Sequence, residues 1–372
     1  MSLFGAIGAI VAIVFFVTAH EFGHFIAAKA VGIKATEFFF GFGPKIWSFK
    51  RGETEYGIKA LPLGGYVRVV GMNPLEEVEP ADEGRTYRDK PFWKKAVVVL
   101  AGVGMNFVIA YLLFAGVLLF NGIPEVSTVV EEVVPVLEDG TPSPAAVAGL
   151  RPGDKLIAID GQPTPDWDAV AIALSTRPGE EVTITVERGG QNLDLTAALA
   201  TREDPTTGVE EGFLGVAPGT VVREIGIIEA ARIGGRQLGI AVGLTFDVLG
   251  RIVQPETLGR LAGVLVGNTE IPDEIRPVSP IGIGNIGAQV DELGWASFVV
   301  LLASVNVMLG TLNVLPLYPL DGGHFAVALY EKVFRRRADV RVLAPVAALV
   351  IGLVGFLGLV AIILDIVNPI DL

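Results

Sequence analysis

The chain has 372 residues, no Cys, a net charge of −13 and 51% hydrophobic residues, and its mean hydropathy is +0.56. The absence of Cys excludes disulfides and thiolate metal ligands, and the acidic balance argues against a nucleic-acid partner. The length alone would suggest two or three soluble domains. The hydropathy predicts instead a membrane protein with one soluble insert.

Four apolar segments are long enough to cross a bilayer, which takes about 20 residues. They are approximately Leu3–Ala28, Ala96–Phe120, Trp295–Leu315 and Val342–Leu364. The loops after the first and third segments are rich in Lys and Arg, whereas the stretch after the second is acidic. Because basic loops remain in the cytoplasm, we expect these two loops there and the acidic insert outside. The first segment lacks the basic start of a signal peptide, so we expect it to be retained.

The first segment contains the motif His20-Glu21-Phe22-Gly23-His24. His20 and His24 are four residues apart, so on a helix they share one face and can bind one metal ion. Glu21 can take a proton from a metal-bound water. The bare pattern also occurs by chance, but ionisable groups at membrane depth are costly and usually functional. Since the chain has only three His, we exclude the histidine-rich membrane di-iron enzymes.

A second motif closes the third segment, from Asn313 to His324. Its two prolines and its Gly pair cannot continue a regular helix, and broken backbone at this depth is tolerated only in protein or beside a wet cavity. Asp321 is well placed as a third ligand, which leaves an open position for water. Two alternatives stay open. Asp321 can instead cap the helix that starts at Gly322, and His324 is a rival ligand.

These paired motifs resemble the site-2 protease family of intramembrane metalloproteases, the M50 type. The likeness extends through Gly41-Phe42-Gly43-Pro44 and Leu61-Pro-Leu-Gly-Gly-Tyr-Val67 and covers nearly the whole chain. The branch it is most similar to is the bacterial one that degrades anti-sigma factors and carries one PDZ domain.

The resemblance implies a zinc metalloendopeptidase with one zinc ion per chain, acting in regulated intramembrane proteolysis. It assigns His20, His24 and Asp321 as zinc ligands, Glu21 as the catalytic base, and Asn313 as a residue that holds the substrate near the metal. It also implies the bacterial cytoplasmic membrane, with single-span membrane proteins such as an anti-sigma factor as substrates.

The loop 37–70 contains aromatic and β-branched residues separated by Gly and Pro, which predicts a small antiparallel sheet. We expect strand, turn and strand within Glu55–Val70. The apolar side chains of the sheet can dip into the bilayer or form an ordinary packed hairpin. A protease must hold its substrate extended, and adding it to an exposed sheet edge would do so. We therefore expect the loop with Gly41, Phe42 and Gly43 to bind substrate.

The insert predicts a small α+β domain, with a helix over Asp166–Ser175 and an alternating strand over Glu181–Arg188. The order of its elements resembles a permuted bacterial PDZ domain, in which Phe213–Val216 would be the carboxylate-binding loop. It could recruit peptide ends or exclude substrates with large ectodomains. After it, Glu224–Arg251 predicts an amphipathic helix on the outer surface.

We therefore predict a polytopic α-helical membrane protein with four transmembrane helices, a membrane-associated β-hairpin loop and an inserted PDZ domain. The predicted parts are a protease core in 1–120 and 291–372, the PDZ domain in 121–220, and a surface helix with connector in 221–290. The function that follows is intramembrane zinc proteolysis. The alternatives are a membrane 2-His-1-carboxylate iron enzyme and a non-catalytic PDZ scaffold. Glu21 discriminates, because only the peptidase needs that base.

Overall fold

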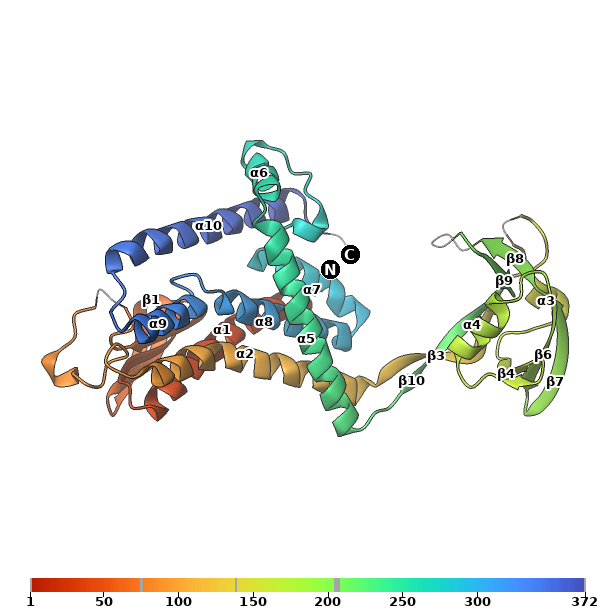
Figure 1. Cartoon of the computed structure of the whole chain (residues 1–372), viewed down its shortest axis with the longest axis horizontal. Coiled ribbons are helices and arrows are strands. Elements are labelled where there is room, and N and C mark those ends of the chain that lie inside the picture. Colours follow the sequence, from red (N-terminus) through yellow and green to blue (C-terminus); the bar gives the residue numbers. More distant parts are fainter. Residues whose placement is uncertain (1, 74–75, 138, 204–207, 371–372) are drawn as a thin grey trace. The chain divides into compact units, whose positions relative to one another are not determined.

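The computed structural model describes residues 2–73, 76–137, 139–203 and 208–370. The chain forms two compact units (Figure 1). The first, here called the helical unit, comprises Met1–Phe120 and Gly226–Leu372. The second, here called the inserted unit, comprises Asn121–Ile225.

Four helices in the described part of the chain are long and apolar enough to cross a membrane. They are α1 (Leu3–Ala30), α2 (Phe92–Asn121), α8 (Trp295–Val314) and α10 (Val340–Val367). The four predicted spans are thereby confirmed, with ends that differ by up to four residues. The hydroxyl of Ser2 caps the start of α1 by accepting a hydrogen bond from the Gly5 amide at 3.1 Å, as Ser does at many helix N-termini.

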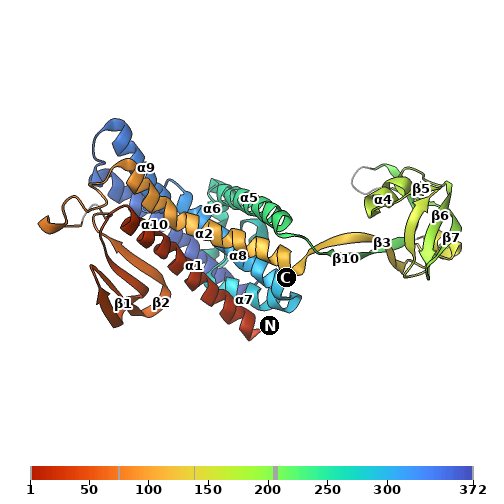
Figure 2. The ribbon, with the colours of Figure 1, turned by 90° about the horizontal axis from the view of Figure 1, so that it is seen from below.

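The remaining helices of the helical unit are α5 (Ile227–Ile252), α6 (Pro255–Gly263), α7 (Pro280–Val290) and α9 (Asp321–Phe334). Helix α5 covers the predicted amphipathic segment and packs against α2 and α8 (Figure 2). Its Leu238, Ala241 and Val242 join the apolar cluster that α2 and α8 form around Ala110 and Val307. The segments Ile227–Ile252 and Pro255–Val266 reach span-like length and hydropathy only as a pair, bent by 73°.

The loop between α1 and α2 folds into strands β1 (Ala35–Arg51) and β2 (Thr54–Val69). The pairing is more elaborate than a hairpin. Phe38 pairs with both Tyr56 and Val67, and Tyr56 also pairs with Phe49, so the two bent strands make a sheet four segments wide. The outer segment around Tyr66–Val69 is one of its two edges. The strand, turn and strand predicted within Glu55–Val70 are confirmed by the pairing, although β2 is one continuous element. Residues 56–58 and 65–67 flank residues 38–40 on opposite sides and run in opposite directions, so β2 reverses between them. A second turn, at Gly52 with a φ of +64°, connects β1 to β2.

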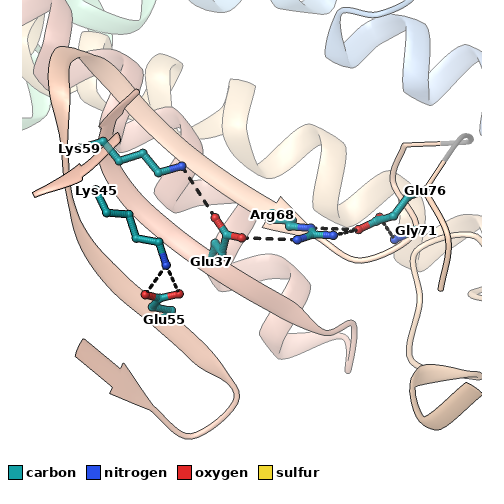
Figure 3. Close-up of polar contacts among 7 residues, drawn as sticks. All are labelled: Glu37, Lys45, Glu55, Lys59, Arg68, Gly71 and Glu76. Atoms are coloured by element: carbon teal, nitrogen blue, oxygen red, sulfur yellow. Dashed lines mark hydrogen bonds and ion pairs between the residues drawn. The ribbon is translucent and has the colours of Figure 1, made fainter. Parts of the chain in front are cut away.

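Ion pairs connect the segments of this sheet (Figure 3). Glu37 on β1 lies 3.5 Å from Arg68 and 3.8 Å from Lys59, both on β2. Arg68 in turn binds Glu76 at 2.9 Å, and Glu76 accepts a hydrogen bond from the Gly71 amide at 2.7 Å. Because Arg68 is about half exposed, each pair stabilises the sheet only weakly. Together, the contacts of Glu76 with Arg68 and with the Gly71 amide hold the backbone where the edge segment ends.

The inserted unit consists of a sheet with the strand order β10-β3-β4-β6-β7, in which β5 also pairs with β4, and a separate β8-β9 pair. Its elements are β3 (Ile123–Val133), α3 (Pro144–Ala148), β4 (Lys155–Ile159), β5 (Gln162–Pro163), α4 (Trp167–Ser175), β6 (Glu181–Arg188), β7 (Gln191–Ala198), β8 (Ala200–Glu203), β9 (Glu210–Phe213) and β10 (Val216–Arg223). Asp166 caps α4 by accepting from the Ala169 amide at 2.8 Å. Strand β6 buries Val182, Ile184 and Val186 in alternation.

One partly buried ion pair braces the inserted unit. Arg188 at the end of β6 donates two hydrogen bonds of 2.7 Å to Asp154, just before β4. Burial alone would raise the pKa of Asp154, but the bonds from Arg188 and from the Arg151 amide outweigh it, and the pKa is lowered. Asp154 is therefore ionised at neutral pH, where it pairs with Arg188 and holds β4 against β6.

Candidate metal centre

His20 and His24 lie on one face of α1, as their spacing predicts. Both are buried, with exposures of 6% and 4%, and their Nε2 atoms are 3.0 Å apart. The Nδ1 of His24 lies 2.8 Å from the carbonyl oxygen of Val98 on α2. A carbonyl can only accept, so Nδ1 must carry the proton. That tautomer leaves Nε2 with a free lone pair that points to the neighbouring histidine.

Asp321 completes a cluster of three donors. It is the first residue of α9, directly after the irregular backbone that follows α8. Its Oδ2 lies 2.9 Å from His20 Nε2 and 3.1 Å from His24 Nε2. Within the described residues these three side chains form a buried group that could hold a metal ion. Ligand atoms of a tetrahedral site with bonds of about 2.0–2.2 Å are separated by roughly 3.3–3.6 Å, a few tenths of an ångström more than the distances seen here.

His324, the rival ligand, is not part of this group. It lies one turn after Asp321 on α9, where its ring packs edge-on against Tyr318 and Tyr87, with ring centroids 4.9 and 6.5 Å away. The geometry therefore favours Asp321 over His324 as the third donor.

Glu21 lies on α1 beside the first histidine and faces the edge segment of the sheet. A Cβ atom on Gly65 would be 2.8 Å from Thr18 Cα and 3.2 Å from Glu21 Cβ and Cγ, and a backbone hydrogen bond connects Val67 with the Glu21 carboxylate. Gly65 thus lets β2 approach α1 next to this carboxylate. Gly65 belongs to the motif 61–67, but the sequence alone does not show that this glycine contacts Thr18 and Glu21.

Asn313 lies in the last turn of α8, partly buried, and its side-chain amide donates to the Leu309 carbonyl at 3.1 Å.

The start of α9, directly after Asp321, requires residues without a side chain. A Cβ on Gly322 or Gly323 would collide with the backbone of Val314 and Tyr318, respectively. These two glycines let α9 start directly against the end of α8, which places Asp321 beside α1.

Gly41, Phe42 and Gly43 lie where β1 bends, and Phe42 pairs with Leu61 on β2. Gly41 has a φ of +91°, and a Cβ there would be 2.7 Å from the Leu61 carbonyl oxygen. Phe42 is 41% exposed, and its ring centroid is 6.4 Å from that of Tyr66. These residues form a corner of the sheet, and none is recorded in contact with the three donors.

A cavity of about 970 Å³ opens beside the candidate centre. One wall is the sheet edge Tyr66–Val69, and another is α10 with the small side chains Ala344, Ala347 and Ala348. His324 and Tyr318 line it where the chain leads to Asp321. The edge segment of the sheet, an apolar face of α10 and the chain that leads to Asp321 therefore line one space, and the three donors themselves are not among the described residues that line it.

Two contacts to α2 complete the centre. A Cβ on Gly102 would come within 2.5 Å of the His24 ring, so only glycine leaves room for the imidazole. One residue earlier, the backbone of Ala101 packs against Gly23. Nothing in the local sequence pattern of α2 reports these contacts.

Comparisons with known proteins agree with this geometry. The family model described as Peptidase family M50 matches residues 8–357. The chain is 35% identical to zinc metalloprotease Rip1 of Mycobacterium tuberculosis, with 97% of this chain and 96% of that protein covered. It is 31% identical to zinc metalloprotease Rip1 of Mycolicibacterium smegmatis, with 97% of each chain covered. A putative zinc metalloprotease of Agrobacterium fabrum is 31% identical, with 91% and 89% covered.

The donors present in this chain fit the metal that these relatives carry in their names. Two imidazole nitrogens and one carboxylate oxygen, with a position left for water, form a donor set of catalytic zinc sites. All three donors are buried on elements that the surrounding glycines bring together. The chain belongs to peptidase family M50 and is a zinc metalloendopeptidase of the membrane.

Proposed function

We propose that this protein is an intramembrane endopeptidase that hydrolyses peptide bonds within or near the transmembrane segment of single-span membrane proteins. The observation that carries the proposal is the convergence of His20, His24 and Asp321, with Glu21 beside them. Three of these residues lie on the span-length helix α1, and Asp321 starts α9, just after the span-length helix α8. Buried ionisable groups in such helices are costly unless they serve a function.

In this proposal His20, His24 and Asp321 hold one zinc ion, which when bound polarises the attacking water and the scissile carbonyl. Glu21 accepts the proton of the attacking water and delivers it to the leaving amine. Asn313 turns its amide from the Leu309 carbonyl to the substrate backbone and holds the scissile bond in place.

Substrate presentation follows from the sheet edge. A helical substrate hides its amides in internal hydrogen bonds, so it must unwind before it reaches the centre. We propose that the unwound segment pairs with Tyr66–Val69 and lies against the alanine face of α10 in the 970 Å³ cavity. Gly41, Phe42 and Gly43 would then act less directly than the sequence suggested, by shaping the corner that supports this edge.

The Lys- and Arg-rich loops after the first and third spans support a cytoplasmic position for the centre. The acidic sequence of the inserted unit supports an extracytoplasmic position for that unit. We propose that the inserted unit is a PDZ domain that restricts access of substrates with large ectodomains. An anti-sigma factor is the substrate class that we propose, in a bacterial cytoplasmic membrane.

The test is a comparison of membrane-protein fragments in cells that carry the wild type or Glu21→Gln. We expect a small set of single-span proteins to lose a cleavage product in the variant, each cut within or near its span. Fragments that depend on Glu21 but are cut only in soluble domains would contradict the proposal.

A further inference from the structure

Several polar side chains are buried between α1, α2 and α8 and have no role in the scheme above. Asn106 on α2 is 1% exposed and Thr311 on α8 is fully buried. Among the described residues, Asn106 Oδ1, Asn306 Oδ1, Thr311 Oγ1 and His20 Nδ1 belong to the buried polar atoms with no hydrogen-bond partner. Buried polar groups are almost always paired in folded proteins. This group contains possible donors (His20 Nδ1–H and the Thr311 hydroxyl) as well as an acceptor (Asn106 Oδ1), so a shared partner could pair them all.

The packing of the helices places these atoms in one region. His24 contacts Val98 and Gly102, and Gly23 contacts Ala101, so α1 and α2 run in opposite directions. One turn back along α1, from His24 to His20, therefore corresponds to one turn forward along α2, from Gly102 to Asn106.

Helix α8 closes the same region from its other side. A Cβ on Gly310 would be 3.2 Å from Asn106 Cβ, and Thr311 is the next residue. The Asn306 side chain also donates to the Asn106 carbonyl oxygen at 2.8 Å. The level of His20 is thus enclosed by Asn106 and by the turn of α8 that contains Thr311.

The two histidines differ in what fixes their tautomer. The Nδ1–H of His24 donates to the Val98 carbonyl, whereas no described group accepts from Nδ1 of His20. Metal-binding histidines almost always donate their second ring N–H to a carbonyl, a carboxylate or a water, and this partner fixes the tautomer and the ring orientation.

We infer that Asn106 is a positioning residue for His20. Its Oδ1 accepts a hydrogen bond from one ordered water, which in turn accepts from His20 Nδ1–H and is also bound by Thr311 Oγ1. None of the three atoms makes a direct hydrogen bond with a described residue, and together they supply the partners that a buried water requires. The arrangement holds Nε2 of His20 as the metal-binding nitrogen. This inference rests on the proposed ligand role of His20.

The test measures zinc affinity by competition with a chelator in detergent-solubilised full-length protein. We expect Asn106→Leu to weaken zinc binding about 10–100-fold, and Asn106→Asp, which keeps an acceptor oxygen at the same place, to restore it to within about threefold. Thr257→Val is the control, because it removes a buried polar atom from α6, outside the three helices that enclose His20. We expect it to leave zinc affinity within about threefold of the wild type.

His20→Ala distinguishes a failure of the ligand role of His20 from a failure of the positioning role of Asn106. If His20→Ala binds zinc as tightly as the wild type, the ligand assignment itself fails. If His20→Ala loses zinc but Asn106→Leu keeps it, only the positioning role is wrong. Equal losses in Asn106→Leu and Thr257→Val, or no rescue by Asn106→Asp, would show a packing effect and likewise overturn it.

A second measurement uses only the wild-type protein, so it does not depend on whether any variant folds. The chain has only three His, so ¹⁵N-histidine labelling of the zinc-loaded wild type yields few ring signals. We expect two slowly exchanging Nδ1–H protons, one from His24 and one from His20. A rapidly exchanging Nδ1–H on His20, or a proton on its Nε2, would overturn the inference.

Discussion

Gly65 controls the distance between the catalytic helix and the sheet. Its missing Cβ permits contact with Thr18 and Glu21, and its φ is not in the positive range, so space rather than backbone strain requires glycine here. We expect Gly65→Ala to slow peptide cleavage at least about tenfold, since small displacements of reacting groups are costly. Zinc content should not change, because no ligand moves.

The control is Gly104→Ala, in which the added methyl group meets no atom within 4 Å. Cleavage assays and zinc analysis of both purified variants make the comparison. Equal activity of the two variants would show that the approach of β2 to α1 is unimportant for catalysis.

Asp321 and His324 are separated by one turn of α9, and the geometry assigns them different roles. Asp321 lies within 3.1 Å of both ligand nitrogens, whereas His324 packs against tyrosines. We expect Asp321→Ala to lower zinc occupancy markedly and His324→Ala to lower it much less. Metal analysis after identical purification measures both, and the reverse order would refute the ligand assignment.

At the scale of elements, the sheet edge Tyr66–Val69 and helix α10 line the space where we propose that the substrate lies. Unwinding a helix in lipid leaves backbone groups unpaired, at a cost of several kcal/mol each. Substrate spans with Gly-Pro beside the scissile bond should therefore be cut faster than spans with Leu-Leu there. Asn313→Leu should slow the cleavage of both while leaving zinc content intact.

This comparison uses two substrates that differ only at those two positions, assayed in detergent at matched binding. Equal rates would mean that unwinding and strand addition do not limit cleavage. In that case the edge segment would have to be given a purely structural role.

Elements governed by local chemistry could be predicted from the sequence. The cap of Asp166 and the alternation of β6 gave α4 and β6 almost to the residue, and the spacing of His20 and His24 indicated a shared helix face. The turn expected within Glu55–Val70 was also found, as a reversal of β2 between residues 58 and 65, where Gly64 has a φ of +138°. Contacts such as Val98 with His24, or Gly65 with Glu21, join distant segments and leave no local pattern.

At the scale of the whole molecule, the proposed ligands and base all lie in the helical unit, and the inserted unit has its own core. Deleting Asn121–Ile225 should therefore preserve zinc binding and chemistry. If the inserted unit restricts access, the variant should cut substrates whose ectodomains have not been trimmed.

Membrane insertion and zinc content of the deletion variant serve as controls for folding. A variant that is inserted and zinc-loaded but cannot cut a pre-trimmed substrate would show that the inserted unit recruits substrates instead. Both results are read from the same cleavage assay with trimmed and untrimmed forms of one substrate.

The most direct measurement is the turnover of purified Glu21→Gln on a single-span substrate, with zinc content determined in the same preparation. Glutamine keeps the size of the side chain but cannot accept the proton of the attacking water. We predict a folded protein with one zinc ion per chain and cleavage slowed at least about a thousandfold. Near-normal turnover in the zinc-loaded variant would contradict the proposed role of Glu21 and the mechanism with it.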